Sequence, residues 1–365
     1  MTVRGEPISS SVIRPASESE PTPCRSFHFS SHPAQEDPMK NNKIAVFITG
    51  GTIGMSPSDS GLGVSPDNNF EQILASLAPR DDIEVEAIFW ADIPSPHMTP
   101  EHMLQLAHDI DQLLEKNDYS GAVVLHGTDL LAETSFVLNV SLTTSKPVIT
   151  TGSMRHLGEA GYDGIRNLQN GLIACTSLPP GGDVLVQMAD WLFSAQDAIK
   201  QDSLSVDPFV SQSRGAVGRI AAGTLILNQN ISKRANKIGK KVEGISANVV
   251  LVTAYPGMPG SLLINLLNQG IEGLVIEGFG AGNIPPTAVG AVRHILQAGI
   301  PVVLASRCIR GGVAPIYDYP GGGAELIDMG CISAGALNGT KALLLLKIAI
   351  SNQVDRSSLQ ELFSL

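Results

Sequence analysis

Two apolar segments that each end in glycine and threonine are the strongest constraint on how this chain folds. The first covers residues 43–54 and reads KIAVFITGGTIG, and the second covers residues 121–129 and reads GAVVLHGTD. An unbroken apolar run before turn residues is typical of a strand that is buried on both faces of a parallel sheet. Ligands of open α/β sheets bind beyond the carboxyl ends of such strands. We therefore expect Thr52 and Thr128 to reach one edge of one sheet.

Apolar strands alternate with helical stretches from Lys43 onward, which predicts an α/β fold in two domains. The larger, N-terminal domain should hold a mostly parallel sheet, and the smaller, C-terminal domain a second α/β unit. The spacing predicts a helix over Pro100–Lys116, with Thr99 as its cap, and a last helix over Lys341–Ile350. The predicted strands are Ile44–Thr49, Ile83–Ile88, Gly121–Leu125, Pro147–Thr151, Val184–Met188, Asn248–Val252, Gly273–Glu277 and Pro301–Ala305.

Changes in composition divide the chain into four parts. Residues 1–42 are rich in Ser, Pro, Glu and Thr and are expected to be a disordered extension without a secretory signal. Residues 43–230 form the expected catalytic domain, and residues 248–365 the expected C-terminal domain. Between them, residues 231–247 are polar and basic, which favours a solvated linker over a binding patch.

The overall charge and the cysteine pattern exclude several classes of protein. The 365 residues carry a net charge of −11, which argues against nucleic acid or an anionic membrane as a partner. No apolar run reaches the roughly 18–20 residues that span a bilayer. The four cysteines form no C-x-x-C pair, so we expect free thiols, as in a cytoplasmic protein. Neither a dinucleotide-binding nor a phosphate-binding glycine pattern is present, and we expect no cofactor and no metal.

An ordered series of motifs resembles the bacterial-type L-asparaginase family, and the resemblance extends from Lys43 to the C-terminus. The two glycine–threonine turns match its two signatures. Further matches are TGSMR at 151–155, DG at 163–164, DAIK at 197–200, SVDPF at 205–209, YPG at 255–257, GAGN at 280–283 and SAGALN at 333–338. This resemblance implies the two-domain fold of the family and hydrolysis of the side-chain amide of L-asparagine to L-aspartate and ammonia.

The resemblance also assigns the reacting groups. It implies that Thr52 is the nucleophile and that Thr128, Asp129 and Lys200 move protons near the amide. An amide is a poor electrophile, so such groups are what its hydrolysis needs. A lysine accepts a proton only as a neutral amine, which burial favours and a neighbouring carboxylate opposes. Asp129 would therefore mainly bind the substrate α-amino group.

Five further residues should bind the amide substrate by the same resemblance. Ser95 would hold the α-carboxylate, and Asn283 would come from a neighbouring subunit of a homotetramer built as a dimer of dimers. The full set is Ser95, Gly51, Gly127, Ser153 and Asn283. Glu325 lies near the place of the family's acidic partner, to which it matches only loosely.

Several residues depart from the family pattern. The tyrosine expected on the loop after Thr52 is absent, and Leu62 stands near its place. Because leucine cannot hydrogen-bond a threonine, we expect free L-asparagine to react about one to three orders of magnitude more slowly than is usual in the family. Pro94 and His97 replace other residues around Ser95, and Leu130–Thr134 differ from the usual acidic pair. We expect His97 to be exposed, and His126 to be packed and hydrogen-bonded rather than an acid or base.

Two alternatives remain at this point. A hydrolase of the same fold could be specialised for an N-acylated or peptide-linked asparagine, since the altered loop leaves room for a larger group. A silent binding protein is the other, but packing alone would not require Thr52, Thr128, Asp129 and Lys200 together.

Overall fold

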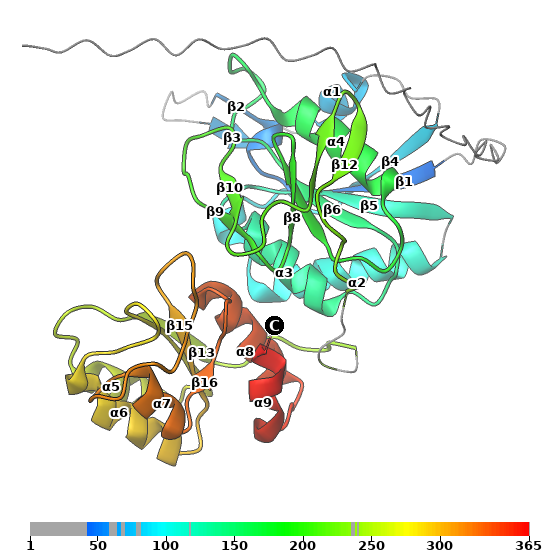
Figure 1. Cartoon of the computed structure of the whole chain (residues 1–365). Helices are drawn as coiled ribbons and strands as arrows, with labels where there is room; N and C mark the ends of the chain where they lie inside the picture. Colours follow the sequence, from blue (N-terminus) through cyan, green and yellow to red (C-terminus); the bar gives the residue numbers. More distant parts are fainter. Residues whose placement is uncertain are drawn as a thin grey trace, which may run out of the picture. The chain divides into compact units, whose positions relative to one another are not determined.

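A computed structural model of the chain describes residues 42–57, 64–66, 70–77, 82–116, 118–234, 238 and 241–364. These residues form the predicted larger N-terminal domain with a mixed, mostly parallel sheet, followed by a smaller parallel α/β domain (Figure 1). The fold class expected from the sequence is confirmed. Within the described part of the chain, none of the helices combines the length and the apolar character that crossing a membrane requires.

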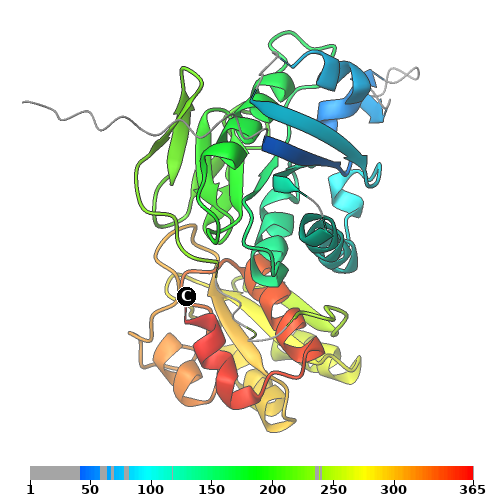
Figure 2. The same ribbon diagram turned by 90° about the vertical axis from the view of Figure 1, so that its right-hand side faces the viewer.

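The N-terminal domain is built on an eight-stranded sheet with the order β12-β11-β8-β7-β6-β5-β1-β4. Strands β4, β1, β5, β6 and β7 run parallel, while β8, β11 and β12 are antiparallel. Figure 2 shows the β11–β12 hairpin and β4 at opposite edges. The strands of this sheet are β1 (Asn42–Ile48), β4 (Ile83–Phe89), β5 (Tyr119–Leu125), β6 (Val148–Thr151), β7 (Leu185–Met188), β8 (Trp191–Ser194), β11 (Gly218–Ala221) and β12 (Thr224–Leu227).

Alternation along the central strands supplies both apolar faces of this sheet. On β1, Ile44, Val46 and Ile48 join one core cluster with α1 (Phe70–Ala75) and α4 (Gly164–Ser177). Ala45 and Phe47 point the other way, toward α2 (Pro100–Lys116) and α3 (Leu131–Ser141). Helices on both faces are what a sheet of buried parallel strands requires. The remaining elements are η1 (Thr52–Gly54), η2 (Ser95–His97) and the two hairpins β2 (Met55–Pro57) with β3 (Val64–Pro66) and β9 (Ala198–Lys200) with β10 (Phe209–Ser211).

The C-terminal domain repeats this construction on a smaller, parallel sheet. Its strand order is β13-β14-β15-β16. One face packs on α5, α6 and α7, and the other on α8 and α9. The elements are β13 (Val249–Thr253), α5 (Gly260–Asn268), β14 (Gly273–Gly278), α6 (Pro286–Gln297), β15 (Val302–Ser306), α7 (Gly323–Asp328), β16 (Ile332–Ser333), α8 (Gly339–Ser351) and α9 (Arg356–Phe363).

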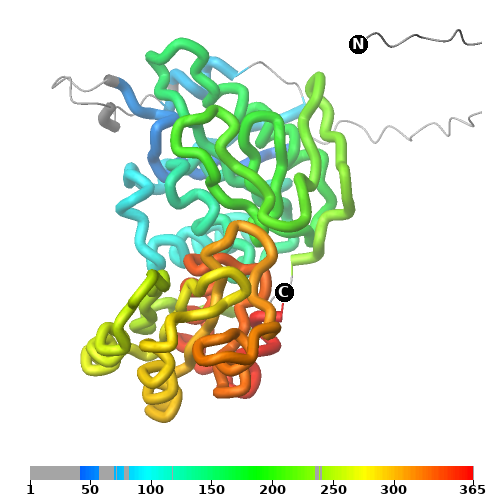
Figure 3. Tube along the Cα trace, turned by 60° about the vertical axis from the view of Figure 1, so that its left-hand side comes forward, coloured from blue at the N-terminus to red at the C-terminus, as the bar shows by residue number. Residues whose placement is uncertain are grey.

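A shared apolar cluster joins the two domains. Helix α8 contacts α3 of the N-terminal domain (Figure 3). Phe136 and Val140 of α3 pack in the same cluster as Leu345 of α8. Val242 and Ile245, in the segment expected to be a linker, are buried in this cluster as well. The C-terminal domain is therefore in apolar contact with the helix that follows the second glycine–threonine turn.

Helix α2 has the bounds that its apolar spacing predicts. Its predicted cap is also confirmed, because Thr99 Oγ1 accepts a hydrogen bond from the backbone N–H of His102 at 3.3 Å. The other predicted strands agree with the structure to within two residues at either end. Strands β8, β11 and β12 and helix α9 were not predicted.

His126 anchors the connection between β5 and α3. Its imidazole is buried, with Nδ1 2.7 Å from the carbonyl oxygen of Gly127 and Nε2 3.0 Å from Thr134 Oγ1. These contacts confirm the packed, hydrogen-bonded role expected for this histidine. Burial lowers the pKa of His126 to about 4, although the Gly127 carbonyl favours the protonated form.

The low pKa of His126 predicts a pH-dependent stability. The unfolded chain binds a proton at His126 below pH about 6.5, whereas the folded protein binds it only near pH 4. As the pH is lowered from about 6.5 to 4, the free energy of unfolding should therefore fall, and His126 should contribute about 3 kcal/mol to this fall. Urea unfolding of the wild type and His126→Gln from pH 7 to 4.5 measures it. Over this range the free energy of unfolding of His126→Gln should fall by about 2–3 kcal/mol less than that of the wild type. Equal decreases in the two proteins would contradict the low pKa of His126.

Candidate active site

The backbones of the two glycine–threonine turns touch at the carboxyl ends of β1 and β5. A methyl group placed on Gly51 would lie 2.5 Å from both Cα and N of Gly127. Gly51 also has a backbone φ of +98°, which residues with a side chain rarely adopt. Only glycine fits there, and the turns that carry Thr52 and Thr128 are in contact through their backbones.

Ser95 closes the same cluster from a third segment. A methyl group on Gly127 would lie 2.7 Å from both Cβ and Oγ of Ser95. Ser95 is only 4% exposed and begins η2, which follows β4. The structure therefore brings Gly51, Gly127 and Ser95 into contact, although they come from three separate loops. His97, at the other end of η2, is exposed as expected.

The short η1 helix that carries Thr52 is fixed on two sides. Tyr162, from the loop before α4, donates its phenol hydrogen to the carbonyl oxygen of Ile53 at 2.8 Å. Burial, with Asp163 nearby, raises the pKa of the Tyr162 phenol, which therefore remains a donor. On the other side, the ring of Phe70 leaves no room for a side chain at Gly54. Thr52 itself is half-buried.

Thr128, Lys200 and Asp129 form a hydrogen-bonded chain. Lys200 Nζ lies 2.9 Å from Thr128 Oγ1 and 2.8 Å from Asp129 Oδ1. The hydroxyl of Thr128 is buried, and the side chains of Lys200 and Asp129 are 17% and 60% exposed. A cationic donor stabilises negative charge that develops on the hydroxyl oxygen. The chain can therefore polarise a threonine and pass protons, and Asp129 leaves a carboxylate open to solvent.

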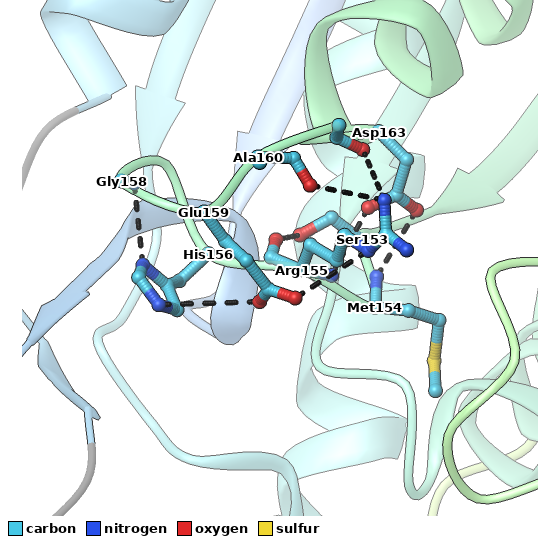
Figure 4. A network of polar contacts seen from close by, with 9 residues as sticks. Ser153, Met154, Arg155, His156, Gly158, Glu159, Ala160 and Asp163 are labelled. Atoms are coloured by element: carbon cyan, nitrogen blue, oxygen red, sulfur yellow. Dashed lines mark hydrogen bonds and ion pairs between the residues drawn. The ribbon is translucent and has the colours of Figure 1, made fainter.

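The loop after β6 is held by a network of polar contacts among its own residues (Figure 4). A methyl group on Gly152 would lie 3.5 Å from the side-chain methyl of Thr128, so this loop lies against the second threonine. Ser153 is buried and donates to the carbonyl oxygen of Arg155 at 2.8 Å. Asp163 holds the loop by accepting the backbone N–H groups of Met154 and Arg155 at 3.1 and 3.0 Å.

The remaining expected residues lie elsewhere. Asn283 follows β14 of the C-terminal domain, and its Oδ1 accepts the N–H of Gly323 at 3.0 Å. Glu325 accepts the N–H of Gly321 at 2.7 Å. Leu62 lies outside the described residues. Among the residues that are described, no group of three or more His, Cys, Asp or Glu could hold a metal ion.

Tyr162 was not predicted to lie in the region around Thr52. Tyr162 and Ile53 are 109 residues apart, and no local pattern connects a loop tyrosine to a distant carbonyl group. The neighbouring pair Asp163-Gly164 was a recognised motif, and it could have drawn attention to the residue before it.

Comparisons with known proteins give one family along the chain. Residues 43–233 match the family model described as asparaginase, N-terminal, and residues 248–363 match the glutaminase/asparaginase C-terminal domain. A protein named "Probable L-asparaginase" from Deinococcus radiodurans is 35% identical over 326 residues, which cover 88% of this chain and 97% of that protein. A protein named "Glutaminase-asparaginase" from Pseudomonas aeruginosa is 28% identical, with coverage of 89% and 90%.

Solved structures agree with the sequence comparisons. The probable cytoplasmic L-asparaginase from Campylobacter jejuni superimposes with a TM-score of 0.75 at 31% identity, covering 88% of this chain and 99% of that one. The thermostable L-asparaginase from Thermococcus kodakarensis shares the fold, with a TM-score of 0.78 at 24% identity and coverage of 88% and 97%. The residues that meet at Gly51 and Gly127, together with these matches over both domains, show that the chain belongs to the asparaginase family.

Proposed function

We propose that this protein is an amidohydrolase that converts L-asparagine to L-aspartate and ammonia, with Thr52 as the nucleophile. The observation that carries the proposal is the contact of the Thr52 and Thr128 turns beside the Lys200–Thr128 hydrogen bond. Relatives named as L-asparaginases support the substrate. No observation favours an N-acylated or peptide-linked asparagine.

The proposed reaction has two halves. Thr52 Oγ1 bonds to the amide carbon, its proton passes to the amide nitrogen, and the C–N bond breaks to release ammonia. Water then attacks the ester, restores the Thr52 hydroxyl and releases L-aspartate. Thr128 and Lys200 carry the protons between these positions and stabilise the charge that develops.

The substrate is held at its other end by opposite charges and hydrogen bonds. The exposed carboxylate of Asp129 binds the α-amino group, and Ser95 donates to the α-carboxylate. Gly51, Gly127 and Ser153 line the space between them. The protein needs no metal and no cofactor for this chemistry, and we propose that it works in the cytoplasm, as the name of the Campylobacter relative indicates for that protein.

Single substitutions of the reacting groups test the function. Thr52→Ala, Thr128→Val and Lys200→Met should each lower kcat for L-asparagine by at least about a hundredfold, because each removes a group that acts in the same step. Double variants should be far from additive. Ammonia release is the measurement, with circular dichroism to establish that each variant is folded.

A matched variant and a substrate panel make this test specific. Thr176→Val removes a hydroxyl that bonds only to backbone within α4, and it should retain kcat within about twofold. Release of ammonia from an N-acylated asparagine but not from the free amino acid would overturn the proposed substrate. Near-normal turnover by Lys200→Met would overturn the proton relay.

We also propose a homotetramer, in which Asn283 of one copy completes the site of another. Exposed apolar side chains lie on the loops of the C-terminal domain that follow β13 and β15 or precede α7, and two of them, Tyr317 and Tyr319, have ring centroids 5.5 Å apart. They are Tyr255, Ile309, Ile316, Tyr317 and Tyr319. Apolar side chains grouped on a surface mark an interaction site more often than scattered ones do.

Disruption of this surface should lower both assembly and activity. The variant Ile316→Glu places a charge at a side chain that is 65% exposed. Light scattering should show particles of lower mass than the wild type, and an activity assay should show reduced ammonia release. Ile226→Glu on β12 of the N-terminal domain is the control, since Ile226 is 42% exposed and lies outside this surface. A fully active wild-type monomer would contradict the proposal.

A further inference from the structure

Lys341 of the C-terminal domain is a fully buried lysine that reaches into the N-terminal domain. Its side chain has no exposed surface. Its Nζ donates to three carbonyl oxygens: those of Ala195 at 2.9 Å and Gln196 at 3.1 Å in the turn after β8, and that of Ala198 at 2.5 Å, the first residue of β9. Three acceptors match the three N–H donors of an ammonium group, whereas a neutral amine would leave one acceptor unpaired.

The position of Lys341 is unfavourable for a cation by itself. It lies in the first turn of α8, where Asn338 Oδ1 accepts its backbone N–H, and the positive end of the helix dipole disfavours a cation there. Burial lowers the pKa of Lys341 to about 8, against the attraction of Glu133 and Asp197. The free energy needed to bury this cation is offset by the hydrogen bonds of its ammonium group, so we look to the bound carbonyl groups for its role.

The turn that Lys341 binds leads directly to Lys200. Strand β9 has only three residues, and Lys200 is the last of them. The other side of the turn is held by the Asp197 carboxylate, which accepts hydrogen bonds from the loop of residues 211–214. Burial alone would raise the pKa of Asp197, but the hydrogen bonds from Ser211 and the backbone of Arg214 outweigh it and hold the carboxyl ionised. The turn is therefore fixed from both sides.

We propose that Lys341 is a positioning residue through which the C-terminal domain sets the place of Lys200 relative to Thr128. As a statement about catalysis, this inference rests on the proposed function. Release of the three carbonyl groups frees the start of a three-residue strand, and Lys200 then loses its fixed distance to Thr128 Oγ1. A displacement of about 1 Å at a reacting group can cost about a hundredfold in rate.

The test compares Lys341→Met with Lys347→Met. Methionine keeps the length of the side chain and removes the ammonium group. Lys347 lies on the same helix and also donates to a backbone carbonyl, that of Ala247, which is outside the turn before β9. Lys341→Met should lower kcat at least about tenfold with KM changed less than about threefold, whereas Lys347→Met should stay within about twofold in both.

A second measurement follows Lys200 without substrate. The protein is treated with an amine-reactive reagent, and the rate at which Lys200 is labelled is measured by peptide mass spectrometry. Lys341→Met should raise this rate several-fold by loosening the bonds of Lys200 to Thr128 and Asp129, and Lys347→Met should not. Unchanged labelling in folded Lys341→Met would overturn the inference. A wild type that releases no ammonia from L-asparagine would instead overturn the proposed function and leave this readout valid.

Lys341→Arg keeps the test decisive if the methionine variant does not fold. Arginine retains the charge and the donors, but its planar guanidinium cannot place three N–H groups as an ammonium does. A folded arginine variant should show a reduced kcat, an altered labelling rate of Lys200 and a nearly unchanged KM. Wild-type values of kcat and labelling would overturn the positioning role.

Discussion

The contact between the backbones of Gly51 and Gly127 is the constraint on which the rest of the site depends. The two glycines lie in the turns that follow neighbouring parallel strands, and a side chain on Gly51 would overlap the Gly127 backbone at 2.5 Å. Because each glycine immediately precedes a threonine, Thr52 and Thr128 lie on turns whose backbones are in contact. The site is thus a consequence of sheet topology and of two residues that lack side chains.

Around this contact, the supporting interactions come from ever more distant parts of the chain. Tyr162 binds the carbonyl oxygen of Ile53, and Lys341 binds the turn before Lys200 across 143 to 146 residues of sequence. Each of these two side chains donates hydrogen bonds to backbone carbonyl groups close to a proposed reacting residue, Tyr162 beside Thr52 and Lys341 before Lys200. In the proposed mechanism, such contacts orient the reacting groups before substrate binds, which is how a rigid site lowers an activation barrier.

Local patterns in the sequence predicted much of this arrangement. Local spacing was sufficient to predict one helix and two strand ends: the helix over Pro100–Lys116 and the strands that precede Thr52 and Thr128. Periodicity and the turn residues at a strand end are local properties of the sequence. Strands β8, β11 and β12 were missed because the prediction rested on strands that alternate with helices, and these three antiparallel strands follow one another without a helix between them. The roles of Tyr162 and Lys341 were missed because they depend on tertiary contacts, and a lysine in an apolar helix looks like any surface lysine until its burial is known.

The most direct test of the account is a crystal structure of the protein with L-aspartate bound. We expect the hydroxyl oxygens of Thr52 and Thr128 to flank the side-chain carboxylate of the aspartate at about 3–3.5 Å, with the α-amino group on Asp129. An aspartate bound elsewhere, or threonine hydroxyl oxygens more than about 8 Å apart around it, would contradict the account.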